Sequence, residues 1–238
     1  MSGFGLPRRH YRVVDSTNSR ARDLAAGGAP GGAVVTAAEQ TEGRGRQGRS
    51  WSAPAGKALL YSAILRPLDR RHLLLPLAVP LAVCEAAEQL QPQVRCQIKW
   101  PNDIWHEGRK LAGILIEARP QDGWAVIGVG LNLAIEEGEF PPELRDTAVS
   151  LFPPGDGLAH QGDSAMLVLN EQLVRWVDAE PDTVLSAWRA RDALLGREVA
   201  WAKGSGVAAG VDDRGNLLVR VAGDEVVSLG AGEVHLRL

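Results

Sequence analysis

One segment organises the interpretation of the whole chain: Gly43-Arg44-Gly45-Arg46-Gln47-Gly48-Arg49-Ser50-Trp51. Three arginines alternate with three glycines, and an aromatic residue closes the run. Glycine lets the backbone take positive φ and approach an anion closely, and arginine is a permanently charged, bidentate phosphate donor. Neither residue type serves a hydrophobic core, and ordering such a loop costs roughly 1 to 2 kcal/mol per residue. The segment therefore predicts an anion-binding loop that is mobile when empty and becomes ordered on its ligand.

Strands are predicted on both sides of this loop, at residues 33–38 and 58–65, because both stretches are mostly apolar and β-compatible. Further upstream, a strand at 11–15 leads into Ser16-Thr17, which can cap a helix running to Ala26. Downstream, residues 76–90 are apolar nearly all round and predict a buried helix. A mostly antiparallel meander follows, with strands at 94–100, 104–106, 110–118 and 124–129.

The C-terminal part of the chain predicts a surface connection, two helices and a small barrel. Proline, glycine and acidic residues dominate 140–162; Asp163 can cap a helix to Val177, and Pro181 can open another to about Leu194. The predicted apolar faces comprise Leu167, Leu173, Val174, Val177, Leu185 and Trp188. Five short alternating runs follow, at 199–202, 207–211, 217–221, 226–229 and 234–236. We expect a catalytic domain over 1–194 and a small β-barrel domain over 195–238.

Composition excludes several classes of protein. With 238 residues and 45% hydrophobic content, the chain can bury a substantial core. A net charge of −3 argues against a protein devoted to non-specific nucleic-acid binding. The two cysteines, Cys84 and Cys96, form no zinc-like pattern and are expected to be reduced. No stretch resembles a signal peptide or an uninterrupted membrane span, so a cytoplasmic protein without membrane contact is expected.

The arginine loop also invites comparison with a phosphate-binding P-loop, because Gly43 and Gly48 have the right spacing. A P-loop needs a lysine followed at once by a helix, whereas Trp51 is followed by a Ser-Ala-Pro-Ala-Gly stretch that does not open one readily. A single RGG-like contact to nucleic acid and a merely solvated basic turn remain alternative interpretations. In a second stretch, residues 99–103 (Lys-Trp-Pro-Asn-Asp), the lysine stands at a strand end where it can meet a carboxylate or a phosphate. Alone it would be interpreted as an ordinary surface lysine, and only its combination with the arginine loop indicates a ligand site.

Six ordered motifs resemble the biotin protein ligase family: Asp15-Ser16-Thr17-Asn18, Glu39-Gln40-Thr41, the arginine loop, Lys99-Trp100-Pro101-Asn102-Asp103, the KLAGILIE stretch at 110–117 and the GVGLN stretch at 128–132. The resemblance runs from about residue 13 to residue 132, and more loosely through the C-terminal strands. It implies an α+β fold, with a mixed sheet and flanking helices related to class II aminoacyl-tRNA synthetases, followed by an SH3-like barrel. It also implies a two-step enzyme that converts biotin and ATP to biotinyl-AMP and pyrophosphate, and then transfers biotin to a lysine of a biotin carboxyl carrier protein.

The resemblance also assigns roles to residues. Biotin-binding roles fall to Ser16, Thr17, Asn18, Gln40, Arg44, Gly45, Arg46 and Lys99. ATP-binding roles fall to Arg46, Arg49, Trp51, Lys99 and Asn132, with Trp51 against adenine and Asn132 at the nucleotide and metal end. Arg46 and Lys99 are the expected catalytic residues, since cationic donors must screen a carboxylate that attacks an α-phosphate. No metal ligand is identified.

Mg²⁺ is the expected cofactor, and biotin, ATP and the carrier domain are the expected partners. Because only about ten residues precede the first predicted strand, no DNA-binding domain and no repressor function are expected. A monomer or a homodimer is left open. The alternatives are a lipoate-type ligase, a non-catalytic biotin or adenylate binder, and a small nucleic-acid-binding module.

Overall fold

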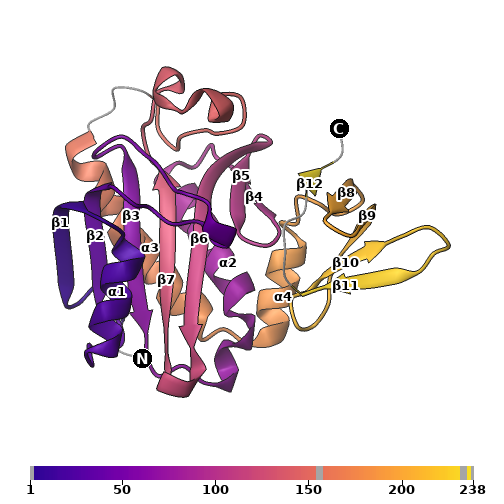
Figure 1. Cartoon of the computed structure of the whole chain (residues 1–238), viewed down its shortest axis with the longest axis horizontal. Helices are drawn as coiled ribbons and strands as arrows, with labels where there is room; N and C mark the ends of the chain where they lie inside the picture. The colour runs from indigo at the N-terminus through magenta and orange to yellow at the C-terminus, as the bar shows by residue number, and fades with distance from the viewer. Residues whose placement is uncertain (1–2, 154–157, 231–234, 237–238) are drawn as a thin grey trace.

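A seven-stranded mixed sheet forms the centre of the protein (Figure 1). The computed structural model describes residues 3–153, 158–230 and 235–236. The strand order is β1-β2-β3-β7-β6-β5-β4. The first two strands, β1 (Arg8–Val14) and β2 (Val34–Gln40), run parallel to each other, and every other neighbouring pair in this sheet is antiparallel.

The remaining strands of this sheet confirm the predicted meander. They are β3 (Ala58–Leu65), β4 (Cys96–Lys99), β5 (Asp103–His106), β6 (Arg109–Arg119) and β7 (Trp124–Asn132). All eight residues of β3 are buried, which explains why its sequence is almost continuously apolar. Because β3 pairs with β7, the strand that follows the arginine loop lies beside the GVGLN stretch of β7.

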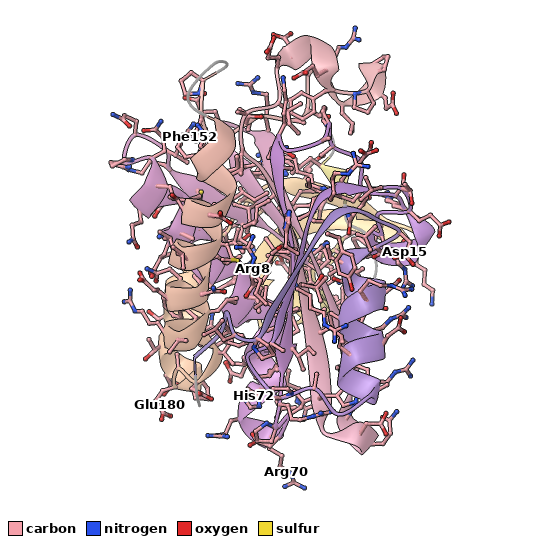
Figure 2. The ribbon with its side chains drawn as sticks, turned by 90° about the vertical axis from the view of Figure 1, so that its left-hand side faces the viewer. Arg8, Asp15, Arg70, His72, Phe152 and Glu180 are labelled. Atoms are coloured by element: carbon pink, nitrogen blue, oxygen red, sulfur yellow. The ribbon has the colours of Figure 1, made fainter. Side chains whose placement is uncertain are left out.

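Helices cover both faces of this sheet. Figure 2 looks along the sheet from its β1 edge, with α1 (Thr17–Ala26) on one side and α3 (Leu158–Val177) on the other, and with Asp15 at the start of α1. The long apolar helix α2 (Leu75–Leu90) packs against α3 and against β4, β5 and β6. Shorter 3₁₀ turns lie at Arg46–Gly48, Arg70–Leu74, Pro120–Asp122, Glu137–Glu139 and Pro142–Leu144.

The predicted start of α1 is confirmed, whereas three predictions for the later helices are wrong. Ser16 is the N-cap of α1 and accepts from the backbone N–H of Ser19. In contrast, α3 begins at Leu158, so Asp163 lies inside it and pairs with Arg8 of β1 at 2.8 Å instead of capping. Two residues assigned to its apolar face are exposed, namely Leu167 (58%) and Val174 (44%). The fourth helix, α4 (Pro181–Arg189), ends five residues before Leu194.

The interior is built around α2. The stretch Arg70–Leu90 is long and apolar enough to cross a membrane by length and composition alone, but 67% of its apolar window is buried inside the protein. Both cysteines are free and buried, as expected, with Cys84 on α2 and Cys96 on β4. Burial is the largest influence on the Cys84 thiol and raises its pKa, which keeps it protonated.

A second, five-stranded antiparallel sheet follows α4, with the order β11-β10-β9-β8-β12 (Figure 1). Its strands are β8 (Glu198–Trp201), β9 (Gly204–Val211), β10 (Leu217–Arg220), β11 (Val226–Leu229) and β12 (His235–Leu236). The predicted small C-terminal β-structure is confirmed. Over residues 3–153, 158–230 and 235–236 no pairing joins β11 to β12, so closure into a barrel stays a prediction, as does the domain boundary at 194/195.

Candidate active site

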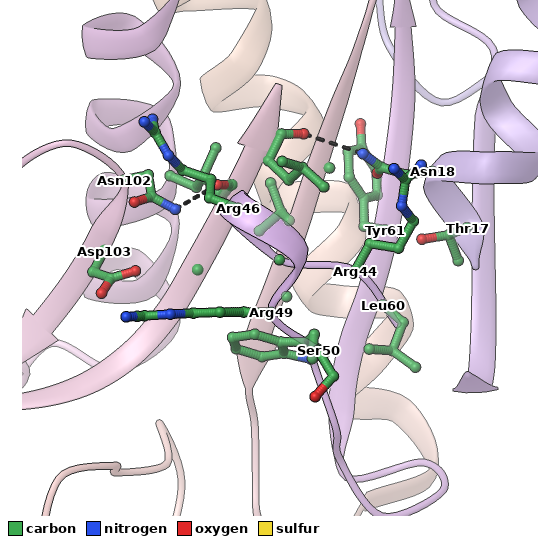
Figure 3. A pocket seen from close by; sticks show the side chains of 18 of the residues that line it. Thr17, Asn18, Arg44, Arg46, Arg49, Ser50, Leu60, Tyr61, Asn102 and Asp103 are labelled. Atoms are coloured by element: carbon green, nitrogen blue, oxygen red, sulfur yellow. Dashed lines mark hydrogen bonds between the residues drawn. The ribbon is translucent and has the colours of Figure 1, made fainter. Parts of the chain in front are cut away.

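A cavity of about 120 Å³ lies where the arginine loop crosses the sheet between α1 and the strand end at Lys99 (Figure 3). Its walls come from seven separate stretches of sequence: the start of α1, the end of β2, the arginine loop, part of β3, the segment 99–103, and strands β6 and β7. All the predicted site residues except Asn132 line it: Ser16, Thr17, Asn18, Gln40, Arg44, Gly45, Arg46, Arg49, Trp51 and Lys99. The fold thus brings the predicted biotin and ATP residues to a single place.

A polar cup closes the α1 end of this cavity. Ser16, Thr17 and Asn18 are all buried, although they are polar, and Gln40 joins them from the end of β2. The Gln40 Oε1 atom accepts from the Thr17 backbone N–H at 2.7 Å and from the Thr17 hydroxyl at 3.0 Å. The cup is therefore preorganised by hydrogen bonds between its own members, which suits recognition of a neutral polar ring.

Two residues that the sequence analysis did not single out hold this cup in place. The fully buried Ser62 on β3 has its Oγ 2.6 Å from Asn18 Oδ1 and 2.8 Å from Thr17 Oγ1. Glu117, at the end of the KLAGILIE stretch, accepts from Asn18 Nδ2 at 2.9 Å and from Arg44 at 3.2 Å. Its position within a motif was the available signal for Glu117, whereas Ser62 looks like an ordinary strand residue.

Hydrogen bonds within the arginine loop define its shape. A β-bridge joins Arg44 to Ser50, and the Trp51 N–H donates to the Gly43 carbonyl at 2.9 Å, so the loop closes on itself. The turn at its tip places Gln47 (φ 54°) and Gly48 (φ 77°) in the left-handed region, which favours glycine. Figure 3 shows Arg44 beside Asn18, while Arg46 and Arg49 extend towards the side where Asn102 and Asp103 lie.

Three glycines form the floor of the cavity and explain why the two strand motifs contain them. On β7, a Cβ at Gly128 would lie 2.1 Å from Asn18 Oδ1, and one at Gly130 would lie 2.4 Å from the Trp51 ring. On β6, Gly113 pairs with Gly130, and a Cβ there would lie 2.9 Å from the same ring. These positions must lack side chains so that Asn18 and Trp51 can lie flat on the sheet.

Lysines define the opposite end of the cavity. The Lys99 ammonium lies 5.4 Å from the centroid of the Trp105 ring, which is within the range of a cation–π contact. Lys110, which the sequence analysis did not single out, also lines the cavity and pairs with Asp103 at 2.7 Å. Asn102 donates to the Ile114 carbonyl at 2.8 Å and so fixes the segment 99–103 to β6.

Asn132 does not line the cavity. It is buried, and its amide donates to the carbonyls of Val149 at 3.0 Å and Lys110 at 3.4 Å. The structure thus gives this side chain a role in anchoring the 147–151 segment to the end of β7, and its contact with the nucleotide stays a prediction.

The charge distribution suits two anions that must approach each other. Three arginines and two lysines surround the cavity, while the carboxylates of Glu117 and Asp103 each pair with a basic residue. Preorganised cations of this kind stabilise negative charge that grows on a transferring phosphoryl group. Within the described ranges no group of three His, Cys, Asp or Glu side chains could hold a metal ion.

Comparison with known proteins agrees with this site. A family model described as "Biotin/lipoate A/B protein ligase family" matches residues 10–133, which include every motif described above. A "Biotin--[acetyl-CoA-carboxylase] ligase" from Mycobacterium tuberculosis is 35% identical, covering 99% of this chain and 92% of its own. One of the same description from Paracoccus denitrificans is 36% identical, covering 90% of this chain and 95% of its own.

Among solved structures, a biotin protein ligase from Aquifex aeolicus in complex with biotin and ATP superposes with a TM-score of 0.80 and 25% sequence identity. The match covers 98% of this chain and 99% of that one, so it includes the second sheet as well as the first. On the family model, the identity to full-length relatives and the shared fold, this chain belongs to the biotin/lipoate A/B protein ligase family.

Proposed function

We propose that this protein activates biotin with ATP and transfers it to a lysine of a biotin carboxyl carrier protein. The observation that carries the proposal is the meeting of two sites in one cavity: a preorganised polar cup at one end and a cluster of five cationic side chains around the rest. The cup fits the uncharged ureido ring of biotin, and the cations fit a carboxylate next to a triphosphate. Full-length relatives described as biotin ligases support the assignment.

In the first step, the biotin carboxylate attacks the α-phosphorus of ATP, a new O–P bond forms and pyrophosphate leaves. We assign the screening of the two anions to Arg46 and Lys99, with Arg44 near the carboxylate and Arg49 near the phosphates. Trp51 would stack against adenine. The protein needs no nucleophile of its own, because biotin supplies it and binding places the reacting atoms together.

In the second step, the carrier lysine attacks the activated carbonyl of biotinyl-AMP, an amide bond forms and AMP leaves. The attacking amine has to lose its proton during this step. The open side of the cavity, where the exposed arginine loop forms one wall, is the route by which we propose the carrier lysine enters.

Magnesium is proposed to arrive with ATP as part of the substrate. Mg²⁺ usually keeps several waters and binds through one or two carboxylates together with substrate phosphates. The residues that line the cavity fit the version of this arrangement with a single carboxylate ligand. That carboxylate would be Asp103, which is paired with Lys110. A metal bound there would neutralise charge on the pyrophosphate.

The remaining assignments are also proposals. We propose a cytoplasmic enzyme that does not bind DNA, which the net charge of −3 supports. Whether it acts as a monomer or as a homodimer would be measured by sedimentation.

The test is ATP–pyrophosphate exchange with and without biotin, for the wild type and Lys99→Ala. We expect exchange that requires biotin and that falls by roughly 10²-fold or more in Lys99→Ala, the scale for removing one preorganised donor. Lipoate is the matched alternative substrate, and exchange that prefers lipoate would make the protein a lipoate-type ligase. Biotin binding without exchange in the wild type would show a non-catalytic binder.

A further inference from the structure

A hydrogen bond joins the second sheet to the segment 99–103, which carries Lys99. The indole N–H of Trp100 donates to the carbonyl of Gly215 at 3.1 Å, and Gly215 lies in the turn between β9 and β10. Trp100 is only 3% exposed and stands next to Lys99. A residue of the second sheet therefore holds the immediate neighbour of the lysine that we assign to catalysis.

This turn is unusually well fixed by one carboxylate. Asp212 Oδ1 accepts from the backbone N–H groups of Arg214 and Asn216, each at 2.9 Å. Its Oδ2 accepts from the Asn216 amide at 2.9 Å and from the Ser228 hydroxyl on β11 at 3.2 Å. Burial opposes ionisation of this group, but these hydrogen bonds outweigh it and lower the pKa of Asp212, so the carboxylate is charged at neutral pH.

The turn also fits closely against the first sheet's helix layer. Gly215 has φ +81°, and a Cβ at this position would lie 3.2 Å from the Leu77 side chain on α2. A glycine is therefore needed for the carbonyl to reach Trp100. A second connection lies beside it, where the Ile98 N–H donates to the Arg191 carbonyl at 2.7 Å and the Ala193 N–H donates to the Ile98 carbonyl at 3.0 Å.

We infer that the second sheet is a positioning element for adenylation, in which Asp212 shapes the turn, the turn holds Trp100, and Trp100 fixes the backbone that carries Lys99. This inference rests on the proposed function. Asp212 does not line the cavity, so it acts through Trp100 and not on the substrates. A displacement of about 1 Å in a reacting group can cost 10²-fold in rate.

The experiment measures biotin-dependent ATP–pyrophosphate exchange in the full chain, below the melting transition of every variant. Asp212→Ala is compared with Asp213→Ala, which alters the neighbouring aspartate, 91% exposed in its side chain and paired with Arg189 at 3.2 Å. We expect Asp212→Ala to lower the maximal exchange rate by tenfold or more, with the KM for biotin within twofold, because the cup on α1 is untouched. Asp213→Ala should behave as the wild type.

A second pair of variants removes the other half of the contact. Trp100→Phe deletes the indole N–H. Trp176→Phe is its matched control, because Trp176 is 4% exposed, donates to Glu85 of α2 at 2.9 Å and does not line the cavity. We expect the exchange rate to fall by tenfold in Trp100→Phe and to stay at the wild-type level in Trp176→Phe. If Asp212→Ala fails to fold, this pair carries the test alone.

The double variant Trp100→Phe/Asp212→Ala separates positioning from general destabilisation. If both residues act through one hydrogen bond, the double variant loses no more exchange than the worse single variant. Losses that multiply, or a wild-type exchange rate in either Asp212→Ala or Trp100→Phe, would overturn the inference. Absence of exchange in the wild type would instead refute the proposed function, so the two failures are distinguishable.

Discussion

Replacing Gly128 by alanine tests the glycine floor of the cavity. The added Cβ would lie 2.1 Å from Asn18 Oδ1 and 2.8 Å from Asn18 Cγ, far inside any contact distance that atoms tolerate. The strand cannot retreat, since Gly128 is paired on both sides, with Ser62 of β3 and Leu115 of β6. Asn18 must therefore leave its place.

The cost follows from the hydrogen bonds that Asn18 loses. Its side chain contacts Ser62 Oγ at 2.6 Å, the Leu115 carbonyl at 3.2 Å and the Glu117 carboxylate at 2.9 Å. With about 1 kcal/mol for each neutral bond and about 1.5 kcal/mol for the charged one, the variant loses roughly 3.5 kcal/mol. At about 2 to 4 °C per kcal/mol, the melting temperature falls by roughly 7 to 14 °C.

Biotin affinity should fall as well, because Asn18 belongs to the cup that we assign to the ureido ring. The loss of one aligned buried partner, about 1.4 kcal/mol, corresponds to about tenfold in Kd. Urea denaturation and isothermal titration calorimetry measure the two effects. Gly138→Ala is the control, since a Cβ there meets nothing within 4 Å. A Gly128→Ala variant with wild-type stability and biotin affinity would refute the interpretation of the floor.

Three further predictions concern charged groups. Glu117→Gln should speed tryptic cleavage of the arginine loop in the protein without added ligand, because Arg44 loses a charged partner at 3.2 Å. In the wild type, saturating biotin with ATP should slow this cleavage. Equal cleavage rates in all samples would contradict both expectations. Burial raises the pKa of Asp192, whose Oδ2 is buried without a hydrogen-bond partner in the part of the chain that the structure describes, so its ionised form costs stability as pH rises. Asp192→Asn should therefore raise the melting temperature at pH 7.5 and make little difference at pH 3, and the reverse pattern would count against this. Burial acts against ionisation of the Glu88 carboxylate, but two hydrogen bonds from Arg191 at 2.7 and 2.8 Å outweigh burial and lower the pKa of Glu88. The ionised carboxylate therefore stabilises the fold above the ordinary glutamate range, and this stabilisation is lost as pH falls through the lowered pKa. Thermal melts should show that Glu88→Gln destabilises the protein at pH 7 by about 2 kcal/mol and has no such effect near pH 2.

Local signals in the sequence predicted most of the first sheet. The bounds predicted for β3 match the structure, and the cap of α1 is Ser16 of the predicted Ser16-Thr17 pair, because strand composition and capping are decided by neighbouring residues. The start of α3 was missed for a long-range reason. Asp163 is a good cap residue by itself, but here it pairs with Arg8 of β1, more than 150 residues away, and the helix extends past it.

In the candidate active site, too, local features were predicted from the sequence and long-range contacts were missed. The motifs named nearly every residue that lines the cavity, since each motif carries its chemistry in a few consecutive residues. Ser62 was missed because its role depends on lying opposite Gly128 across two strands that are distant in sequence. The spacing of Gly128 and Gly130 was a usable signal, because residues two apart share one face of a strand. The contact of Asn132 with the Val149 carbonyl could not be predicted, because Val149 lies in a loop whose path is not encoded in any local sequence pattern.

The glycine floor also limits how the substrate range of this protein could be redesigned. Glycine is already the smallest residue, so the slot cannot be deepened by substitution at Gly113, Gly128 or Gly130. Directly over this floor, bulkier biotin analogues could gain room by trimming Asn18 or Trp51, and each of these has a role of its own. Selection for bulkier substrates should therefore yield changes in α1 and the arginine loop and leave the three floor glycines in place.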